Sequence, residues 1–258
     1  MLTVPVTKGE YHTPSTAACW PLNLMPTPGF YVQAFWIVFR AALMAKKGMY
    51  IDGDWALSSL RTIRALERCG AELDIRGLEH VQASHEPCVF IGNHMSTLET
   101  FALPTLIAPY RRVTFVIKQS LIDYPLFKHV MRSRDPVVVN RSNPREDLKV
   151  VLEEGIKRLK QGVSIVVFPQ TTRTTEFAPE HFNSIGIKLA QKAGVPVIPL
   201  ALKTDAWGNG QRLKDFGRID PSRRIHIEFG APMAVSGQAR DAHQQIIHFI
   251  QDRLQQWQ

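Results

Sequence analysis

The chain has 258 residues, of which 45% are hydrophobic and 21% charged, and 31 Lys and Arg against 23 Asp and Glu give a formal net charge of +8. This length and composition predict one large folded domain with an appendage, and exclude a disordered chain. The 3 cysteines are too few and too scattered for a disulfide framework or a zinc site, which favours a reducing compartment. The positive charge favours an acidic partner: an anionic membrane, a phosphorylated substrate, an acidic carrier protein or nucleic acid.

The first 28 residues predict an extended, poorly packed lead-in because they are rich in proline. A secretory signal is not expected here, because neither a basic start nor an early apolar stretch is present. The prolines lie at Pro5, Pro14, Pro21, Pro26 and Pro28.

Residues 29–69 are expected to form two helices. Residues 30–45 are apolar except for two positions, and residues 55–68 place their apolar side chains near one face. Flanking Lys and Arg, with Tyr31, Trp36 and Trp55 as interfacial rings, are typical of a hairpin that lies in one leaflet of a membrane. The alternative is that both helices pack on the core of the same protein. The first is too short and too interrupted to be read with confidence as a membrane span.

Residues 70–258 alternate short β-rich runs with helices and predict an α/β domain. The fold expected is a mixed, largely parallel sheet flanked by helices and preceded by the two-helix segment. A helix begins after Asn143-Pro144 and covers 145–160, a second covers 179–193, and a last one is capped by Ser236 and reaches Trp257. Strands are expected at 72–76, 88–92, 114–118, 137–140, 164–168, 195–202 and 225–229.

The segment IGNHMSTLE, residues 91–99, carries the sharpest local pattern. A buried strand ends just before His94, and Glu99 follows five residues later. On a regular helix these two side chains are about 140° apart, so they meet only if His94 lies on a non-helical entry and Glu99 on the first turn, with Ser96 as a cap. A His–carboxylate pair at a strand end is the geometry of a general base with an orienting acid. Taken alone, such a pair is more often structural.

Three cations also lie at the ends of apolar runs. Lys118 ends one run, Arg141 follows another, and Arg173 follows a third. If these strands are parallel neighbours, the three cations line one rim together with His94. Such a rim is suited to a phosphorylated substrate, because arginine binds phosphate oxygens in a bidentate manner. The alternative for each cation is a solvated side chain with no such role.

Five motifs occur in a fixed order along residues 73–232. In order and spacing the chain resembles the glycerolipid acyltransferases of the 1-acylglycerol-3-phosphate acyltransferase (lysophosphatidate acyltransferase) family. The motifs are N-H-x-x-x-x-E at 93–99, F-V-x-K followed by P-L-F at 115–118 and 125–127, V-x-x-x-R at 137–141, F-P-Q-T-T-R at 168–173 and V-P-V-x-P at 195–199.

The resemblance implies transfer of a fatty acyl group from a thioester, on coenzyme A or acyl carrier protein, to a lipid hydroxyl. The acceptor it favours is 1-acylglycerol-3-phosphate, in phospholipid biosynthesis. It implies that His94 is the general base and Glu99 its orienting acid. It also implies that Lys118, Arg141 and Arg173 bind the acceptor's phosphate or polar head, with no metal and no resident cofactor.

Two departures from the family pattern leave the acceptor open. Gln170-Thr171 stands where the family has Glu-Gly, and Glu99 stands where aspartate is commoner. A lyso-amino-acid lipid or a glycolipid is therefore an alternative acceptor. A non-catalytic lipid- or acyl-carrier-binding module is an alternative function, and a nucleic-acid-binding protein is a remote one.

The expected partners are membrane lipids and the acyl donor, without nucleic acid. The expected location is the membrane, at the cytoplasmic face of the inner membrane. Acyl length, the choice between coenzyme A and carrier protein, and the oligomeric state are not indicated by the sequence.

Overall fold

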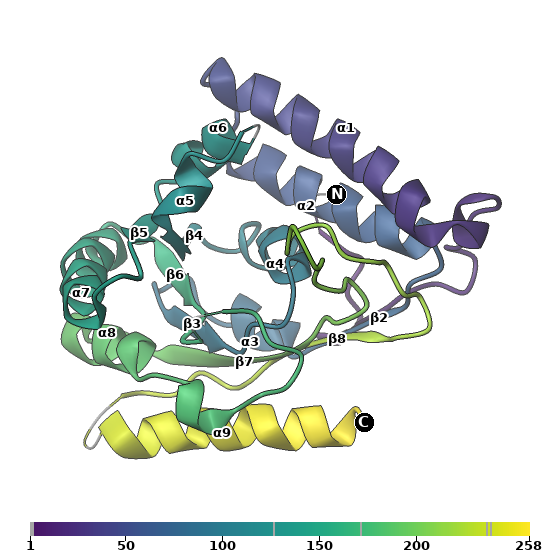
Figure 1. Cartoon of the computed structure of the whole chain (residues 1–258). Helices are drawn as coiled ribbons and strands as arrows, with labels where there is room; N and C mark the ends of the chain where they lie inside the picture. The colour runs from purple at the N-terminus through teal and green to yellow at the C-terminus, as the bar shows by residue number, and fades with distance from the viewer. Residues whose placement is uncertain (1–2, 126, 171, 236, 238) are drawn as a thin grey trace.

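The computed structural model describes residues 3–125, 127–170, 172–235, 237 and 239–258 (Figure 1). Within them an eight-stranded sheet runs in the order β1-β2-β8-β7-β3-β6-β4-β5. Only β1–β2 and β7–β8 pair antiparallel. The other neighbours are parallel, so the predicted mixed, largely parallel sheet is confirmed. The strands are β1 (Tyr11–His12), β2 (Leu73–Arg76), β3 (Val89–Gly92), β4 (Val113–Lys118), β5 (Val137–Val139), β6 (Ser164–Val167), β7 (Val197–Lys203) and β8 (Ile225–Phe229).

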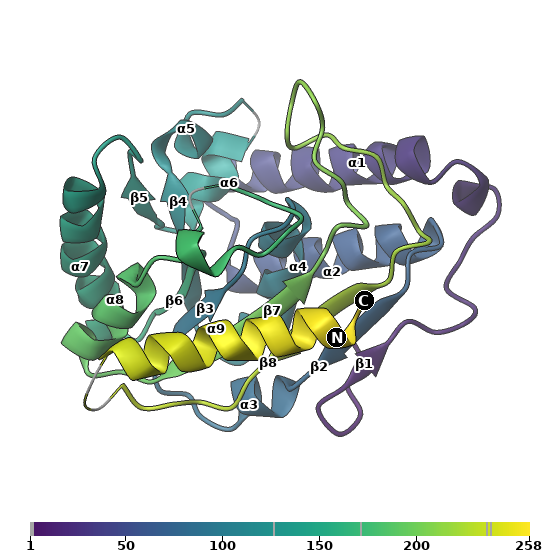
Figure 2. The same ribbon diagram turned by 60° about the horizontal axis from the view of Figure 1, so that its bottom comes forward.

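Helices cover both faces of the sheet (Figures 1 and 2). The alternation of side chains along β3 places Phe90 in one core and Val89 and Ile91 in the other. The core that contains Phe90 lies under α1 (Pro26–Lys46), α2 (Asp52–Arg68), α3 (Leu78–Gln82), α4 (Leu98–Ile107), α5 (Gln119–Ile122) and α6 (Phe127–Ser133). The opposite core lies under α7 (Pro144–Lys160), α8 (Ile185–Ala193) and α9 (Ala239–Gln256).

Two helix boundaries show how local polar groups set the elements. The predicted start of α7 is confirmed: the Asn143 side chain accepts a hydrogen bond from the Arg145 backbone N–H at 3.1 Å. The helix predicted over 179–193 is wrong at its start, because only a 3₁₀ turn (Pro179–His181) precedes α8. Asn183 interrupts it, since its side chain accepts from the Ile185 N–H at 3.0 Å and donates to the Pro169 carbonyl. The predicted cap Ser236 lies outside the described residues.

The expectation of a poorly packed lead-in is wrong only for its first part, because no residue of 12–28 is buried and α1 already begins at Pro26. β1 pairs with β2, and Tyr11 within it is buried. The Tyr11 hydroxyl donates to the buried Glu67 carboxylate, and Arg64 donates to both groups. The Thr13 hydroxyl also donates to Glu67, at 2.9 Å, so this polar cluster attaches the lead-in to α2 by two of its side chains.

The two N-terminal helices form successive layers. Helix α1 packs on α2 and α6, and α2 packs on α4 (Figure 1). Trp55 of α2 is buried, its ring 5.8 Å from that of Phe115 and the Arg134 guanidinium 5.5 Å above it. The expectation of Trp55 as an interfacial ring is therefore wrong, because the ring is buried in contact with Phe115 and Arg134.

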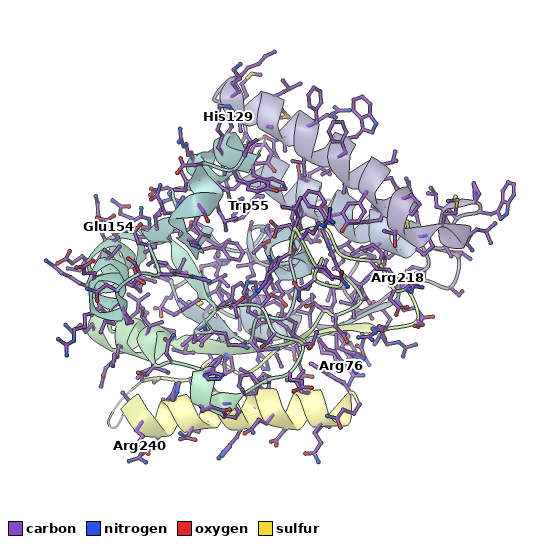
Figure 3. All side chains as sticks on the ribbon, viewed as in Figure 1. Trp55, Arg76, His129, Glu154, Arg218 and Arg240 are labelled. Atoms are coloured by element: carbon purple, nitrogen blue, oxygen red, sulfur yellow. The ribbon has the colours of Figure 1, made fainter. Side chains whose placement is uncertain are left out.

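Helix α1 buries one stripe and exposes another that is also apolar. It is long and apolar enough to cross a membrane by length and composition alone, with 28% of its most apolar window buried against the protein. Side chains on its outer side point away from the rest of the chain (Figure 3). Its exposed large apolar side chains are Val32, Phe35, Trp36 and Leu43.

Candidate active site

The site begins where β3 separates from β7. The Asn93 side chain replaces backbone there: its Nδ2 donates to the Leu202 carbonyl at 2.7 Å, and its Oδ1 accepts from the Leu202 N–H at 2.9 Å. The preceding Gly92 is needed for close approach, since a Cβ there would lie 2.8 Å from the Leu200 carbonyl oxygen. The chain is thus free to turn before α4 without leaving the β7 backbone unpaired.

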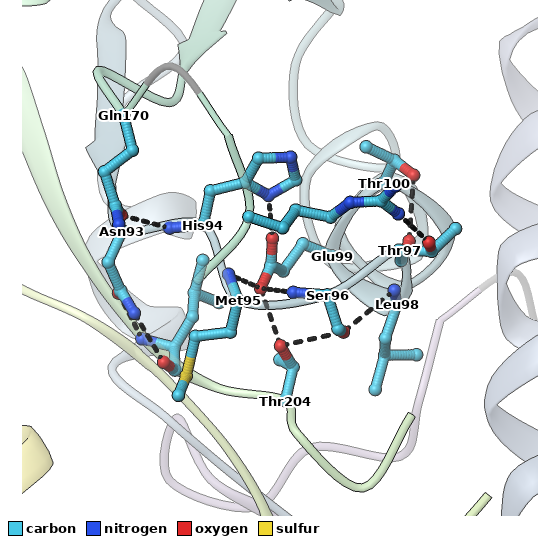
Figure 4. Close-up of polar contacts among 12 residues, drawn as sticks. Asn93, His94, Met95, Ser96, Thr97, Leu98, Glu99, Thr100, Gln170 and Thr204 are labelled. Carbon is cyan, nitrogen blue, oxygen red and sulfur yellow. Dashed lines mark hydrogen bonds and ion pairs between the residues drawn. The ribbon is translucent and has the colours of Figure 1, made fainter. Parts of the chain in front are cut away.

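This turn brings His94 and Glu99 into contact. Nδ1 of His94 is hydrogen-bonded to Oε2 of Glu99, which is fully buried, while 14% of the His94 side chain is exposed (Figure 4). The imidazole stacks on the Phe168 ring with centroids 4.5 Å apart and planes 6° apart. Nε2 consequently faces away from Glu99 and is the nitrogen left to meet a substrate. The predicted geometry is present: His94 is on the non-helical entry and Glu99 is in the first turn of α4.

The second oxygen of Glu99 is held by three donors. Oε1 accepts from the N–H groups of Met95 at 2.8 Å and Ser96 at 3.0 Å, and from the Thr204 hydroxyl at 2.6 Å (Figure 4). The Ser96 hydroxyl donates to Thr204 at 3.0 Å and accepts at 3.1 Å from the N–H of Leu98, the first residue of α4. Three donors on one oxygen fit an ionised carboxylate, whose orientation is therefore fixed.

Gln170, one of the two residues that depart from the family pattern, supports the histidine. Its side chain is buried, its Oε1 accepts from the His94 backbone N–H at 2.7 Å, and its Nε2 donates to the Thr174 hydroxyl at 2.8 Å. The Thr174 N–H in turn donates to the His94 carbonyl at 3.0 Å. The amide therefore holds the His94 backbone from one side while Thr174 holds the other. Thr171 lies outside the described residues, as does Leu126 of the P-L-F segment.

The predicted cations share one edge of the sheet with His94. Strands β3, β6, β4 and β5 are consecutive and parallel, so their carboxyl ends face the same way. Lys118 ends β4 with an exposed side chain, and Arg141 follows β5 with a left-handed φ of 58°. The pKa of Arg141 is lowered by partial removal from water and by the charge of Arg173, against the opposite effect of Asp147. Arg141 and Arg173 are therefore within electrostatic range of one another.

Arg173 is the cation most closely tied to the catalytic turn. Its guanidinium donates to the Thr97 hydroxyl and lies 2.9 Å from Oδ1 of Asp215, with 15% of its side chain exposed. Thr97 immediately precedes α4, so Arg173 contacts the short segment that carries His94 and Glu99. Among the described residues no cluster of three or more His, Cys, Asp or Glu side chains is arranged to hold a metal ion.

Sequence reasoning missed the contributions of the segment after β7. Thr204 holds Glu99, Asn209 donates to the Met95 carbonyl at 2.9 Å, and Asp215 pairs with Arg173. Thr204 had one usable signal: it is a polar residue directly after a buried strand, like the other site residues. Asp215 had none, because its partner is far away in the sequence.

Comparison with known proteins shows which family this chain resembles. The acyltransferase family model matches residues 72–203, about half of the chain. A protein of Pseudomonas aeruginosa named 1-acyl-sn-glycerol-3-phosphate acyltransferase is 34% identical over 190 residues, which are 72% of this chain and 71% of that protein. The chain belongs to the 1-acyl-sn-glycerol-3-phosphate acyltransferase family. It is therefore an acyltransferase, and the predicted resemblance is confirmed.

A second relative differs in length, and a solved structure shares the fold of this chain. A chloroplast protein of Brassica napus with the same enzyme name is 32% identical over 129 residues, covering 50% of this chain and 36% of its own. The crystal structure of the 1-acyl-sn-glycerophosphate acyltransferase from Thermotoga maritima matches with a TM-score of 0.68 over 91% of this chain and 95% of that one, at 20% identity. The fold of the acyltransferase is thus shared with that structure over most of both chains.

Thr204→Val tests the support of Glu99 in this acyltransferase. Valine keeps the shape but removes the hydroxyl that donates to Oε1. We expect kcat to fall about tenfold, because a hydrogen bond to a charged group contributes about 1.5–3 kcal/mol and a tenfold rate is about 1.4 kcal/mol. The matched control is Thr62→Val, a buried threonine that donates within α2. Equal rates for the two variants would show that Thr204 does not act on Glu99.

Proposed function

We propose that the acyltransferase moves a fatty acyl group from a thioester of coenzyme A or acyl carrier protein to the free hydroxyl of 1-acylglycerol-3-phosphate. The observation that supports this most is the contact of His94 with the buried Glu99, next to Arg173, which donates to Thr97 in the same turn. The Glu99 carboxylate accepts a hydrogen bond from Nδ1–H, which keeps the ring proton on Nδ1. Nε2 therefore carries the lone pair that can accept a proton from an alcohol.

In the proposed reaction the acceptor hydroxyl gives its proton to Nε2 of His94 as its oxygen attacks the thioester carbonyl carbon. The C–O bond forms, the C–S bond breaks, and the leaving thiolate takes the proton back from the imidazolium. Glu99 stabilises the imidazolium without moving, because its other oxygen is held by Thr204 and two backbone N–H groups.

The acceptor's phosphate would lie on the cationic rim. Arg173 offers a planar guanidinium close to the catalytic turn, and Arg141 is electrostatically coupled to it. Lys118 adds an exposed ammonium at the end of the neighbouring strand. Two guanidinium groups are suited to a phosphate monoester, since each can donate two parallel hydrogen bonds to its oxygens.

Helix α1 would place this site at a membrane. Its outer side is apolar, and Tyr31, Val32, Phe35 and Trp36 line a depression of about 460 Å³ together with Pro28. Because α1 also packs along α2, the arrangement favours a helix that lies in the interface over one that crosses the bilayer. We propose that α1 lies at the cytoplasmic face of the inner membrane, where acyl thioesters and reduced cysteines such as the free Cys69 are expected.

The assay for the proposal combines purified protein, labelled acyl thioesters on each carrier, and a panel of lysolipids. We expect 1-acylglycerol-3-phosphate to be acylated with the highest kcat/KM. A higher kcat/KM for a lyso-amino-acid lipid or a glycolipid would show that the proposed acceptor is wrong and leave the proposed reaction unchanged. Binding of lysolipids without any product would support a non-catalytic module instead.

The membrane role of α1 is tested with Phe35→Asp combined with Trp36→Asp. The substitutions replace two exposed rings on the apolar side of α1 by charged side chains. Binding to phosphatidylglycerol-containing vesicles should therefore weaken by about tenfold or more. The control, Gln244→Asp with Gln245→Asp, adds the same charges on exposed positions of α9 across the sheet. Equal vesicle binding by both double variants would refute the assignment.

A further inference from the structure

Residues 208–217, the 208–217 loop, form an excursion between β7 and β8 that closes on itself. Trp207 pairs with Ile219 at its base, and the Gly208 N–H donates to the Arg218 carbonyl at 3.0 Å. The two ends lie so close that a Cβ on Gly217 would overlap the Gly208 carbonyl. The base of the loop is therefore fixed, and the loop rises beside α1 (Figure 2).

The loop contacts both segments that build the active site. Asp215 Oδ1 lies 2.9 Å from the Arg173 guanidinium and accepts from the Thr97 hydroxyl at 3.3 Å. The neighbouring Lys214 donates to the Thr172 hydroxyl at 3.0 Å. Thr172 and Arg173 belong to the segment after β6, so the loop is attached to the cationic rim through two adjacent side chains.

The Asp215 carboxylate pairs with the Arg173 guanidinium, which in the proposed function binds the acceptor's phosphate. A guanidinium binds carboxylate and phosphate oxygens with the same donors, so the two anions compete for Arg173. Asp215 is 34% exposed and reaches Arg173 from the side of the loop, while Arg173 is mostly covered. A head group that binds Arg173 must therefore displace this carboxylate or share the guanidinium with it.

The outcome of that competition depends on the charge of the head group. A carboxylate carries one negative charge, whereas a phosphate monoester carries about 1.5–2 near pH 7. Arg141 is coupled to Arg173 and adds attraction for the more highly charged ligand. A monoester is thus favoured over a singly charged phosphodiester, which gains little over the aspartate that it has to replace.

We propose that Asp215 is a specificity-determining residue: an internal counter-ion that leaves Arg173 only for a phosphate monoester head group. This inference rests on the proposed function, because it uses the same site and acceptor. It makes the 208–217 loop the part of the chain that distinguishes lysophosphatidate from other lysophospholipids.

The first test is kinetic and uses Asp215→Asn and Asp215→Ser. For 1-acylglycerol-3-phosphate we expect KM to fall about three- to fivefold and kcat to stay unchanged. This is the effect of removing a partly exposed ion pair that competes with the acceptor. Transfer to the singly charged lysophosphatidylglycerol should rise relative to the wild type. Asp215→Glu should keep the wild-type preference. An unchanged or raised KM in both uncharged variants, or unchanged selectivity, overturns the proposal.

The second test needs no turnover. Isothermal titration calorimetry with sn-glycerol 3-phosphate as the head-group probe should give a Kd about three- to fivefold lower for Asp215→Asn than for the wild type. The control, Glu72→Gln, removes a carboxylate from an exposed ion pair with Arg224 and should not change the Kd. Equal or weaker binding by Asp215→Asn overturns the proposal, and thermal unfolding shows whether loss of fold is the reason. A wild type that transfers no acyl group would refute the proposed function, while this titration would still decide the role of Asp215.

Discussion

His94→Ala should lower kcat for acyl transfer by about 10²–10⁴-fold, the range that general base catalysis contributes. The physical reason is the position of the ring: Glu99 holds Nδ1, Phe168 holds the face, and only Nε2 remains to take the acceptor's proton. Alanine leaves Arg173 and the cationic rim in place, so KM for the acceptor should change much less than kcat. Steady-state kinetics with a saturating acyl thioester measures both.

His248→Ala is the control for this substitution. His248 is an exposed histidine on α9, on the other side of the sheet from the catalytic turn. It should leave kcat as in the wild type. A His94→Ala variant that keeps wild-type activity would exclude His94 as the base, whatever its contact with Glu99.

Glu99→Gln should lower kcat by on the order of 10³-fold although it changes almost nothing in shape. The glutamine carbonyl oxygen can take the place of Oε1, accepting from Met95, Ser96 and Thr204. The amide nitrogen then faces Nδ1 of His94 and donates to it. The ring proton has to move to Nε2, and the nitrogen that meets the acceptor no longer has a lone pair for its proton.

The same substitution separates orientation of the base from stability of the fold. Because every donor on Oε1 keeps an acceptor, the thermal unfolding temperature of Glu99→Gln should stay close to that of the wild type. Glu99→Ala should both inactivate and destabilise, since three buried donors lose their partner. A fully active Glu99→Gln would mean that Glu99 has only a structural role and does not orient the base.

The layout of the sheet and of the rim could be predicted from sequence because both depend on short local patterns. Apolar runs such as the one before His94 specify strands covered on both faces, and the carboxyl ends of parallel neighbours meet at one edge. Asn143 and Pro144 likewise specify where α7 starts. In each case the information lies within a few residues of the element that it determines.

The rest depends on contacts between residues far apart in the sequence. Thr204 reaches Glu99 across 105 positions, and Tyr11 reaches Glu67 across 56, so no local periodicity announces either contact. Trp55 has the flanks of an interfacial ring but is buried against Phe115 and Arg134. Gln170, a departure that left the acceptor in doubt, contributes a buried amide that holds the His94 backbone. Only the packed structure assigns these roles.

Direct transfer by the His94–Glu99 pair is tested most directly by the acceptor dependence of thiol release. Purified protein is mixed with acyl-CoA, and free thiol is followed before and after 1-acylglycerol-3-phosphate is added. The structure predicts thiol release only after the acceptor is present, in amounts equal to the phosphatidate formed, with the protein mass unchanged. Thiol release without acceptor, together with an acyl adduct on the protein, would contradict it.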